Sequence, residues 1–483
     1  MQDMVLVLNF DDNASRALAR KLRSERIMCR LVPGDTALED IQAQEPLGLL
    51  LAGGATGRSS SGMDARLPGC GLPILALGDA AGMLLAALGG AVGDPLLQGA
   101  VIGVQYQDSP LFAEVENGER LLQNVREFTL PEQTAPLCFA QEIVLGFAHR
   151  ELPLYGIQFG LEQNDPEGGA ILRNFALSIC GCTPWWDYAA FCSRAEEEIK
   201  RRAGAGRAVC AMTGGLDSGV SALLAYRALG PNLKCIFVDT GLLREREAED
   251  FLAYYRDTAG LNIIRVGAQR RFLDALRGVT DPNEKRGIIG GLIQRILREQ
   301  AADLGPFDVL VRGTSCSDAM AGGVITKTAL GTNAQAVEPV RDLFKDEIRQ
   351  AADYLGIPQD IISRQPFPGS GLAMRIMGEV TEERLKTLRA ADAIFRDEVQ
   401  RSAASKRLWQ YFAVLCPMIG DESKSVICLR AVHASERSQA YAARLPYDVM
   451  ESAVDAILRD QKDVCRVVYD LTPSANYAGI EWQ

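Results

Sequence analysis

The stretch Ala211-Met-Thr-Gly-Gly-Leu-Asp-Ser218 decides the fold that we expect for the middle of the chain. It lies between a β-rich run, Ala208–Met212, and a helical pattern, Gly219–Ala228, and is therefore predicted to be a turn from a strand into a helix. The two consecutive glycines let the backbone curl until its amide N–H groups point inward above the helix N-terminus. Such a turn is suited to bind a phosphate group.

Three side chains of this turn would complete a phosphate site. Thr213 and Ser218 bring hydroxyl donors, and Asp217 can hold a Mg²⁺ ion that neutralises a leaving pyrophosphate. The turn is not a Walker A loop, because no Gly-Lys pair followed by Ser or Thr comes after four spacer residues. An ordinary turn in which Ser or Asp caps the helix is the competing interpretation of these residues alone.

Strands and helices alternate on both sides of the turn. Downstream, we predict strands at Leu233–Val238, Ile263–Val266 and Val309–Val311 and helices at Arg246–Thr258, Ile288–Leu304 and Lys345–Leu355. Upstream, we predict strands at Met4–Phe10, Ile27–Val32, Leu47–Ala52, Leu72–Leu77 and Leu154–Phe159 and helices at Asn13–Ser24, Ala80–Leu88 and Gly169–Ile179. Strands separated by helices predict an α/β fold with parallel sheets and helices on both faces.

Changes in composition divide the chain into three expected domains. Pro184-Trp-Trp186 leads into a charged helix and marks a joint, and the pattern changes again after Pro366-Phe-Pro-Gly369. Around Val101–Val115 the pattern predicts short strands with turns. The C-terminal part is expected to hold helices at Glu382–Arg401 and Tyr447–Gln461 and strands at Val426–Val432 and Arg466–Tyr469. The predicted domains are residues 1–186, 187–364 and 365–483.

The overall composition excludes several classes of protein. The chain has 483 residues, of which 47% are hydrophobic and 23% charged, as expected for a folded protein rather than a disordered one. Its net charge of −11 argues against a broad nucleic-acid surface, which needs many Lys and Arg contacts. With only His149 and His433, a His-rich metal site cannot be built.

Cysteine usage and hydropathy predict a cytoplasmic protein. The chain has 12 cysteines but no Cys-x-x-Cys pair, and no signal peptide precedes the first strand, so we expect free thiols in a reducing compartment. No run reaches the roughly 18 apolar residues that a membrane helix requires. We therefore expect no membrane partner.

The glycine-rich turn resembles the PP-loop of N-type ATP pyrophosphatases, usually Ser-Gly-Gly-Val-Asp-Ser. Further stretches resemble the GMP synthetase family in order from about Ile179 onward: Phe237–Arg244, Arg271–Lys285, Val337–Glu347, Pro366–Ala373 and Arg466–Trp482. The residues before Ile179 resemble that family's class I glutamine amidotransferase domain. The resemblance implies an amidotransferase-like domain, an adenine nucleotide α-hydrolase-like PP-loop domain with a parallel sheet, and a small α+β dimerisation domain.

The resemblance also implies which residues bind ATP and Mg²⁺. Asp217 would hold the metal, Asp217 and Ser218 would act in catalysis, and Lys345 would supply a cation to the phosphates. The residues implied in nucleotide binding are Thr213, Gly214, Gly215, Leu216, Asp217, Ser218, Asp239, Arg244, Gly313 and Asp318. Helix capping is the alternative for Asp239, and a solvated helix face is the alternative for Lys345.

The glutaminase chemistry of the family is missing from the first domain. The family's Pro-Val-Leu-Gly-Ile-Cys elbow aligns with Pro73–Gly78, so the nucleophile position is Gly78. The family's Gln-Phe-His-Pro-Glu aligns with a stretch in which Gly160 stands at the base position and only Glu162 matches. The expected oxyanion turn, Gly53-Gly54-Ala55, has nothing to stabilise. We therefore expect no glutamine hydrolysis and a nucleophile such as free ammonia.

The substrate segments also depart from the family pattern. Asp318 is kept, but Ala321 replaces a Glu, the stretch Lys327–Asn333 lacks the family's histidines, and Ser474–Gln483 lacks its Lys. These departures weaken xanthylate as the expected substrate while they leave the ATP chemistry intact. Cys316, in the same region, could pass sulfur to an adenylated carbonyl, or be an ordinary small buried residue.

Three hypotheses follow. The first is an ATP-dependent ligase that adenylates an oxo-purine nucleotide, xanthylate or a relative, and takes free ammonia. The second is a paralogue that installs sulfur on a purine nucleotide such as GMP, and the third is a nucleotide-binding pseudoenzyme. Apolar runs at Val426–Val432 and Val464–Tyr469 would leave exposed patches if unpaired, so we also expect a homodimer.

Overall fold

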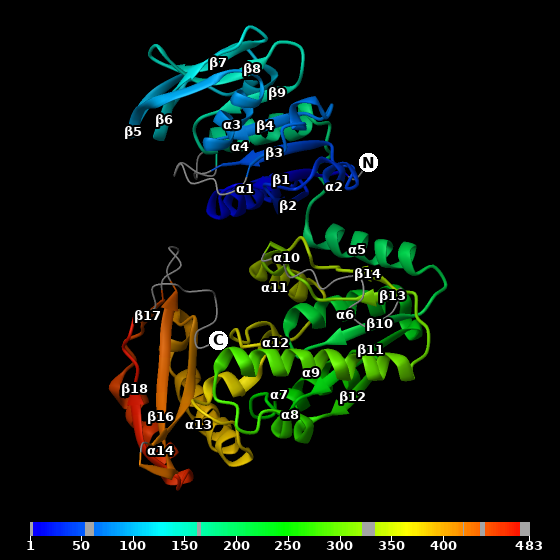
Figure 1. Cartoon of the computed structure of the whole chain (residues 1–483), viewed down its shortest axis with the longest axis vertical. Helices are drawn as coiled ribbons and strands as arrows, with labels where there is room; N and C mark the ends of the chain where they lie inside the picture. Colours follow the sequence, from blue (N-terminus) through cyan, green and yellow to red (C-terminus); the bar gives the residue numbers. More distant parts are fainter. Residues whose placement is uncertain are drawn as a thin grey trace. The chain divides into compact units, whose positions relative to one another are not determined.

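The protein has a mixed α/β fold that divides into two compact units (Figure 1). The computed structural model describes residues 3–53, 62–161, 166–320, 334–418, 420–434 and 440–473. The first unit spans Met1–Ser193 together with Cys316–Gly323, and the second spans Arg194–Ser315 together with Val324–Gln483. The predicted joint after residue 186 therefore lies close to the end of the first unit.

The first unit is built on a nine-stranded sheet in the order β2-β1-β3-β4-β9-β8-β7-β5-β6. Its first five strands are parallel, and the others pair antiparallel. The strands are β1 (Val5–Asn9), β2 (Cys29–Pro33), β3 (Gly48–Ala52), β4 (Ile74–Leu77), β5 (Ala91–Tyr106), β6 (Gly118–Thr129), β7 (Thr134–Ala140), β8 (Ile143–His149) and β9 (Leu154–Ile157). The helices are α1 (Asp12–Ser24), α2 (Leu38–Gln42), α3 (Asp79–Ala87), α4 (Pro166–Arg173), the π-helix η3 (Asn174–Ile179) and α10 (Cys316–Met320), and α5 (Tyr188–Ala203) begins in the first unit and continues into the second.

The central strands of this sheet confirm the sequence prediction. β3 and β4 are apolar runs, Gly-Leu-Leu-Leu-Ala and Ile-Leu-Ala-Leu, in which every residue is buried. Such runs are typical of parallel strands that are covered on both faces. Helix α1 begins where predicted, because the Asp11 carboxylate accepts a hydrogen bond from the Ala14 amide at 2.9 Å and caps its first turn.

The prediction of short strands around Val101–Val115 is wrong. Val101 lies within β5, which is 16 residues long and pairs antiparallel with the 12-residue β6. Most residues of β5 are exposed or half-buried, so the ribbon lacks the clean alternation that identifies a half-buried strand. Irregular register between Val92 and Leu97, next to Pro95, interrupts the pattern further.

The second unit contains a five-stranded parallel sheet in the order β12-β11-β10-β13-β14. Its strands are β10 (Ala208–Met212), β11 (Leu233–Asp239), β12 (Ile263–Gly267), β13 (Val309–Val311) and β14 (Gln335–Val337). Its helices are α6 (Leu216–Leu229), α7 (Glu247–Leu252), the π-helix η5 (Ala253–Thr258), α8 (Gln269–Ala275), α9 (Pro282–Asp303), α11 (Lys345–Tyr354) and α12 (Gln359–Ile362). The chain leaves β10 toward β11 and β12 and later returns on the other side of β10 as β13.

The C-terminal residues of the second unit form a smaller sheet covered by two helices, α13 (Glu382–Arg401) and α14 (Tyr447–Asp460) (Figure 1). The strands are β15 (Gln410–Met418), β16 (Asp421–Ala434), β17 (Ala440–Ala442) and β18 (Val464–Tyr469). One hydrophobic core contains Ile236 of β11, Phe395 of α13 and Leu429 of β16. This core crosses residue 364, and the domain boundary that we predicted there stays a prediction.

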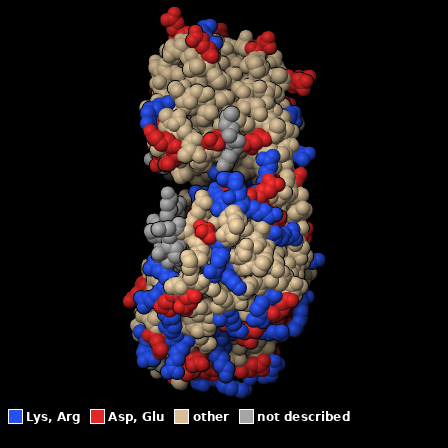
Figure 2. Space-filling view, turned by 90° about the vertical axis from the view of Figure 1, so that its right-hand side faces the viewer, with Lys and Arg blue, Asp and Glu red and all other residues tan. Residues whose placement is uncertain are grey.

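No helix among the described residues is long and apolar enough to cross a membrane. On the face that Figure 2 presents, basic and acidic side chains are interspersed over the lower part of the molecule.

Candidate active site

The PP-loop, residues Ala211–Ser218, lies at the point of the parallel sheet where the order of the strands reverses. It connects β10 to α6, and β10 is flanked by β11 on one side and by β13 on the other. In an open parallel sheet, ligands bind beyond the carboxyl ends of the strands at such a switch point. The order of strands thus places the predicted ATP residues at the position where the fold favours a ligand.

Local hydrogen bonds hold the PP-loop in a tight turn. Gly214 has a φ of 84°, a left-handed conformation that favours glycine. The Ser218 hydroxyl donates to the Gly215 carbonyl at 2.9 Å and accepts from the Thr213 amide at 3.2 Å. The hydroxyl oxygens of Thr213 and Ser218 are also 3.2 Å apart. The two predicted hydroxyl groups are therefore brought together at the first turn of α6.

Two glycines allow other segments to approach the start of α6 closely. A Cβ atom on Gly313, which follows β13, would lie 2.5 Å from the Ser218 amide nitrogen. A Cβ atom on Gly219 would lie 2.1 Å from the hydroxyl oxygen of the buried Tyr255. Both distances are too short for a real Cβ atom. Gly313 can therefore lie next to the PP-loop only because glycine has no side chain.

Lys345 and Asp217 meet at the PP-loop. The Lys345 ammonium group forms an ion pair with the Asp217 carboxylate, whose side chain is 21% exposed. Lys345 is the first residue of α11, where the Glu347 carboxylate accepts a hydrogen bond from the Phe344 amide at 2.8 Å. That bond fixes the first turn of α11 and thereby the direction in which Lys345 leaves the helix. The Lys345 side chain is 51% exposed and pairs with Asp217, and its role toward phosphates stays a prediction.

The residues of the PP-loop fit Mg²⁺ bound together with a polyphosphate. Asp217 offers carboxylate oxygens, which are ligands that Mg²⁺ prefers. Within the described ranges, no group of three or more His, Cys, Asp or Glu side chains could hold a metal ion. One carboxylate with substrate phosphates and water is a normal ligand set for Mg²⁺. Lys345 would then be free to pair with a phosphate.

Asp239 ends β11 at the same edge of the sheet. One oxygen of its carboxylate accepts from the Gly241 amide at 3.1 Å, and the other accepts from Arg265 Nε at 3.0 Å. Arg265 is on β12 and also forms an ion pair with Glu249, 3.2 Å away. The carboxylate stabilises the turn after β11 and caps no helix in the part of the chain that the structure describes. Its role in ATP binding stays a prediction.

Arg244 lies inside the protein rather than at an open edge. Its side chain is 3% exposed, stacks on Phe367 with 4.2 Å from guanidinium to ring centroid, and lies 3.7 Å from Asp392. Burial lowers the pKa of Arg244 despite the neighbouring Asp392. Direct contact of Arg244 with a nucleotide stays a prediction, and its surroundings in this structure are those of a structural residue.

Arg375 and Arg396 share the carboxylate of Asp392 with Arg244. The shortest nitrogen–oxygen distances from Arg375 and Arg396 to Asp392 are both 3.9 Å, and Arg375 is fully buried against Phe412. Burial and the charge of Arg244 lower the pKa of Arg375 to about 9. Sequence inspection missed this cluster, because Arg244 and Arg375 come from other segments than Asp392 and Arg396, which are four residues apart on α13.

Cys316 and Asp318 lie on α10, which packs against β2 in the first unit. Cys316 is 2% exposed. Within the second unit, Gly313, Lys345, Phe237 and Leu243 lie next to the PP-loop. The predicted roles of Cys316 in catalysis and of Asp318 in nucleotide binding therefore stay predictions. Ala321, Lys327–Asn333 and Ser474–Gln483 lie outside the described residues.

Gly78, the residue at the predicted nucleophile position of the first unit, lies in a sharp turn from a strand into a helix. Gly78 stands between β4 and α3 with φ 59° and ψ −132°, a conformation that strains any residue with a side chain. Its amide donates to the Ile157 carbonyl at 2.9 Å. A Cβ atom on Gly53 would lie 2.3 Å from the Ala80 amide nitrogen, so the neighbouring turn also packs closely on the elbow. Gly54, Ala55 and Glu162 lie outside the described residues.

Both histidines of the chain make local hydrogen bonds to the main chain. His149 ends β8, and its Nδ1 accepts hydrogen bonds from the amides of Glu151 and Leu152, both at 3.1 Å. His433 is in the second unit, where its Nδ1 lies 2.7 Å from the Arg407 carbonyl oxygen. Gly160, at the predicted base position, follows β9 and has no side chain that could take a proton.

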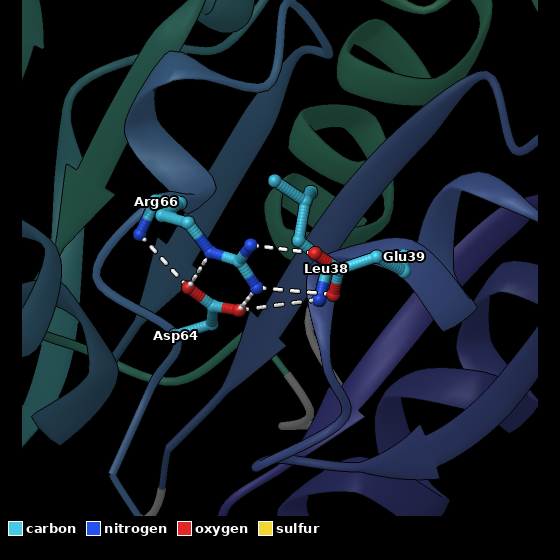
Figure 3. A network of polar contacts seen from close by, with 4 residues as sticks. All are labelled: Leu38, Glu39, Asp64 and Arg66. Carbon is cyan, nitrogen blue, oxygen red and sulfur yellow. Dashed lines mark hydrogen bonds and ion pairs between the residues drawn. The ribbon is translucent and has the colours of Figure 1, made fainter.

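A polar network in the first unit was also missed by sequence inspection (Figure 3). Arg66 donates to Asp64 and to Glu39, and Asp64 also accepts from the Leu38 amide at the start of α2 at 3.2 Å. The Arg66 hydrogen bonds hold the pKa of Asp64 and that of Glu39 below their ordinary values. The network ties the segment around Asp64 to α2, which is a structural task.

Comparisons with known proteins match the whole chain. Residues 188–408 match the NAD synthase family, and residues 397–482 match the family of GMP synthase C-terminal domains. A GMP synthase (glutamine-hydrolyzing) of Caldicellulosiruptor saccharolyticus is 38% identical over 100% of this chain and 99% of that protein. The corresponding protein of Carboxydothermus hydrogenoformans is 37% identical, and that of Clostridium perfringens is 35% identical, each over 100% of both chains.

Proposed function

This chain belongs to the GMP synthase family of ATP-dependent ligases, and from that premise we propose that it adenylates an oxo-purine nucleotide and aminates it with free ammonia. The observation that carries the proposal is the contrast between two turns. The PP-loop keeps Asp217 in contact with Lys345. The elbow of the first unit keeps its backbone conformation but has Gly78 at its tip.

The chemistry assigned to the second unit is a transfer in two steps. A carbonyl oxygen of the purine attacks the α-phosphorus of ATP, the bond to the β-phosphate oxygen breaks, and pyrophosphate leaves. Ammonia then attacks the activated ring carbon, AMP departs with the original oxygen, and a proton is lost to water. Mg²⁺, when bound, would neutralise the charge that develops on the leaving pyrophosphate.

The residues of the PP-loop would position and neutralise the phosphates. The first amide groups of α6 and the Thr213 hydroxyl would donate to the anion, the Ser218 hydroxyl would do so after turning from the Gly215 carbonyl, and Lys345 would move from Asp217 to a phosphate oxygen. Such preorganised donors act by stabilising charge as it develops, which is the main task in phosphoryl-type chemistry.

Free ammonia as the nitrogen donor follows from the first unit. Glutamine hydrolysis in this family uses a Cys activated by a His, whereas Gly78 and Gly160 stand at those positions here. The relatives named above are called glutamine-hydrolyzing. We therefore propose that this chain differs from them in its nitrogen source and keeps the first unit as a scaffold.

A nucleotide panel tests this function. The protein is incubated with ATP, Mg²⁺ and ammonium chloride, and the release of pyrophosphate is measured with xanthylate, inosinate and guanylate. We expect release with at least one of them and AMP in equal amount. A parallel reaction with sulfide in place of ammonium tests sulfur transfer, and equal turnover by Cys316→Ser excludes a sulfur-carrying role for that thiol. No release with any nucleotide would contradict the proposal.

A further inference from the structure

We propose that helix α13 positions the β11 loop, residues Thr240–Arg244, and through it the PP-loop, which makes Arg389 a positioning residue of the nucleotide site. The inference rests on the proposed function, because it gives this loop a part in holding ATP. It concerns α13 (Glu382–Arg401), a helix of the segment that resembles a dimerisation domain.

The C-terminal segment holds the β11 loop by its main-chain carbonyl groups. Arg389 Nε donates to the Leu243 carbonyl at 3.0 Å, and Arg389 Nη2 donates to the Gly241 carbonyl. The Leu372 amide donates to the carbonyl between them, that of Leu242, at 2.7 Å. Three consecutive carbonyl groups of the loop are thus bound by residues that follow position 364. A guanidinium fork fixes two acceptors in one geometry, which a single Lys donor cannot do.

Two glycines in left-handed conformations allow close approaches at the β11 loop, Gly241 to α8 and Gly371 of the C-terminal segment to Leu242. Gly241 has a φ of 71°, and a Cβ atom there would lie 2.5 Å from Gln269 Cγ. Gly371 has a φ of 69°, and a Cβ atom there would lie 2.4 Å from the Leu242 carbonyl oxygen. Neither position would accept a side chain without moving the backbone. The approach of the two segments is therefore built into the main chain.

The same loop lies next to the PP-loop. A Cβ atom on Gly214 would lie 3.9 Å from Leu243 Cδ1, so the Leu243 side chain packs beside the left-handed glycine of the PP-loop. At its other end, the loop is fixed by the Gly241 amide, which donates to Asp239. Arg389 thus holds the carbonyl of Leu243, whose side chain lies beside Gly214 of the PP-loop. A shift of α13 would be transmitted to the PP-loop through one residue.

An ion pair also stabilises the attachment of α13 to the β11 loop. Asp392 lies one turn after Arg389 on α13, with Oδ2 3.7 Å from Arg244 Nε, the last residue of the loop. Asp392 Oδ1 accepts from the Ala413 amide at 3.0 Å, which anchors the carboxylate to β15. One face of α13 therefore binds both the carbonyl groups and the terminal side chain of the β11 loop.

The test compares two arginines of the same helix. Arg389→Ala removes both hydrogen bonds to the loop, while Arg401→Ala removes an arginine that is 71% exposed and pairs only with Glu398 among the described residues. The binding of α,β-methylene-ATP with Mg²⁺, which cannot release pyrophosphate, is measured by calorimetry on the full chain. Steady-state kinetics give KM separately for ATP and for the purine nucleotide.

We expect Arg389→Ala to raise the Kd for the analogue and the KM for ATP about tenfold, the effect of losing directed hydrogen bonds to the loop. The KM for the purine nucleotide and both constants of Arg401→Ala should stay within about twofold. Arg389→Lys, which keeps the charge but can hold only one carbonyl group, should give an intermediate Kd and serves if Arg389→Ala fails to fold.

An unchanged Kd in Arg389→Ala, or an equal rise of both KM values, would overturn the inference and leave the proposed function standing. A wild-type protein that neither binds the analogue nor releases pyrophosphate would contradict the proposed function, and this inference with it.

Discussion

At the scale of single residues, the ion pair of Lys345 and Asp217 is the feature that most directly connects geometry to chemistry. Both side chains point at the turn where a pyrophosphate would lie, from two helices that are far apart in sequence. A carboxylate that can take a metal and an ammonium group that can take a phosphate neutralise each other until substrate arrives. The ion pair then has to break, so we expect it to matter more for catalysis than for the stability of the fold.

Lys345→Ala is expected to lower pyrophosphate release at saturating substrate by at least about 100-fold, because a preorganised cation at the developing charge is lost. The free energy of unfolding should change by less than about 1 kcal/mol, since half-exposed ion pairs add little. Lys386→Ala, which removes an exposed lysine of α13, is the matched control. Turnover of Lys345→Ala within threefold of wild type would contradict the role.

Gly78 gives a second prediction at this scale. Gly78→Ala should destabilise the first unit by about 1–3 kcal/mol, because a Cβ atom is strained at φ 59° and ψ −132°. Hydrogen exchange followed by mass spectrometry would report it as faster exchange in peptides that cover β4 and α3. Gly103→Ala, at an open position of β5, should leave the same peptides unchanged. Equal exchange in both variants would mean that the elbow holds no strain.

Single residues also show where prediction from sequence ends. Thr213, Ser218 and Asp217 could be predicted because their chemistry is contained in eight consecutive residues. Arg244 could be placed just after a strand, but its burial against Phe367 and Asp392 depends on segments more than 100 residues downstream. Contacts between such distant segments leave no local sequence pattern from which they could be predicted.

At the scale of elements, the parallel strands were the most predictable part. β10, β13 and α13 have the predicted bounds. Apolar runs mark the ends of the two strands, and Thr381, whose side chain accepts from the Arg384 amide, marks the start of α13. β14 and β15 were not predicted. β14 has three residues and offers no periodicity, whereas β15 is buried along most of its length and therefore does not alternate.

Lys285, in α9, joins that helix to the C-terminal segment. Its ammonium group donates to the carbonyl groups of Ala373, Ile376 and Gly378, at 3.4, 2.8 and 2.5 Å. Lys285→Met would leave these buried carbonyl groups without that donor, and it should lower the free energy of unfolding by at least about 2 kcal/mol. Urea unfolding of the full chain measures this, with Lys386→Met as the exposed control. A change below 0.5 kcal/mol would contradict it.

The same lysine predicts a dependence on pH. Burial, with the nearby charge of Arg384, lowers the pKa of Lys285 to about 8 from 10.5. Between these values the unfolded chain binds the extra proton, so the contribution of Lys285 to stability rises with pH across this window. The difference in unfolding free energy between wild type and Lys285→Met should be larger at about pH 10 than at about pH 7.5. A smaller difference at the higher pH would contradict the assigned direction.

At the scale of the whole molecule, the second unit behaves as one body in its packing. Its core runs from Val209 beside the PP-loop to Val464 in the last strand, and the Asp392 cluster lies between them. The sequence suggested two domains here because composition changes after Pro366-Phe-Pro-Gly369. The two sheets share one core, and the boundary predicted between them stays a prediction.

Asp392→Asn tests the unity of that body. The change leaves Arg244, Arg375 and Arg396 without their shared counter-charge and should cost about 3–5 kcal/mol, as for other broken buried ion pairs. Hydrogen exchange should accelerate together in β11 and β15 and stay unchanged in β1 and β3 of the first unit. Asp397→Asn, exposed on the same helix, is the control. Acceleration confined to β15 would show two independent domains.

We thus propose that the whole chain combines a second unit equipped for ATP chemistry with a first unit whose elbow lacks a nucleophile. Family membership supports the first half of this account, and the residues at positions 78 and 160 support the second. In this account the low number of histidines is connected to function, because Gly160 stands at the position where the family has the histidine base of its glutaminase.

The central claim is tested most directly by the source of the nitrogen atom. The protein is given ATP, Mg²⁺, the accepted purine nucleotide, unlabelled ammonium and glutamine labelled with ¹⁵N at its amide, and the product is analysed by mass spectrometry. We predict a product without ¹⁵N and no glutamate formed. A product that carries the amide ¹⁵N would contradict the account, because it would require a working glutaminase in this chain.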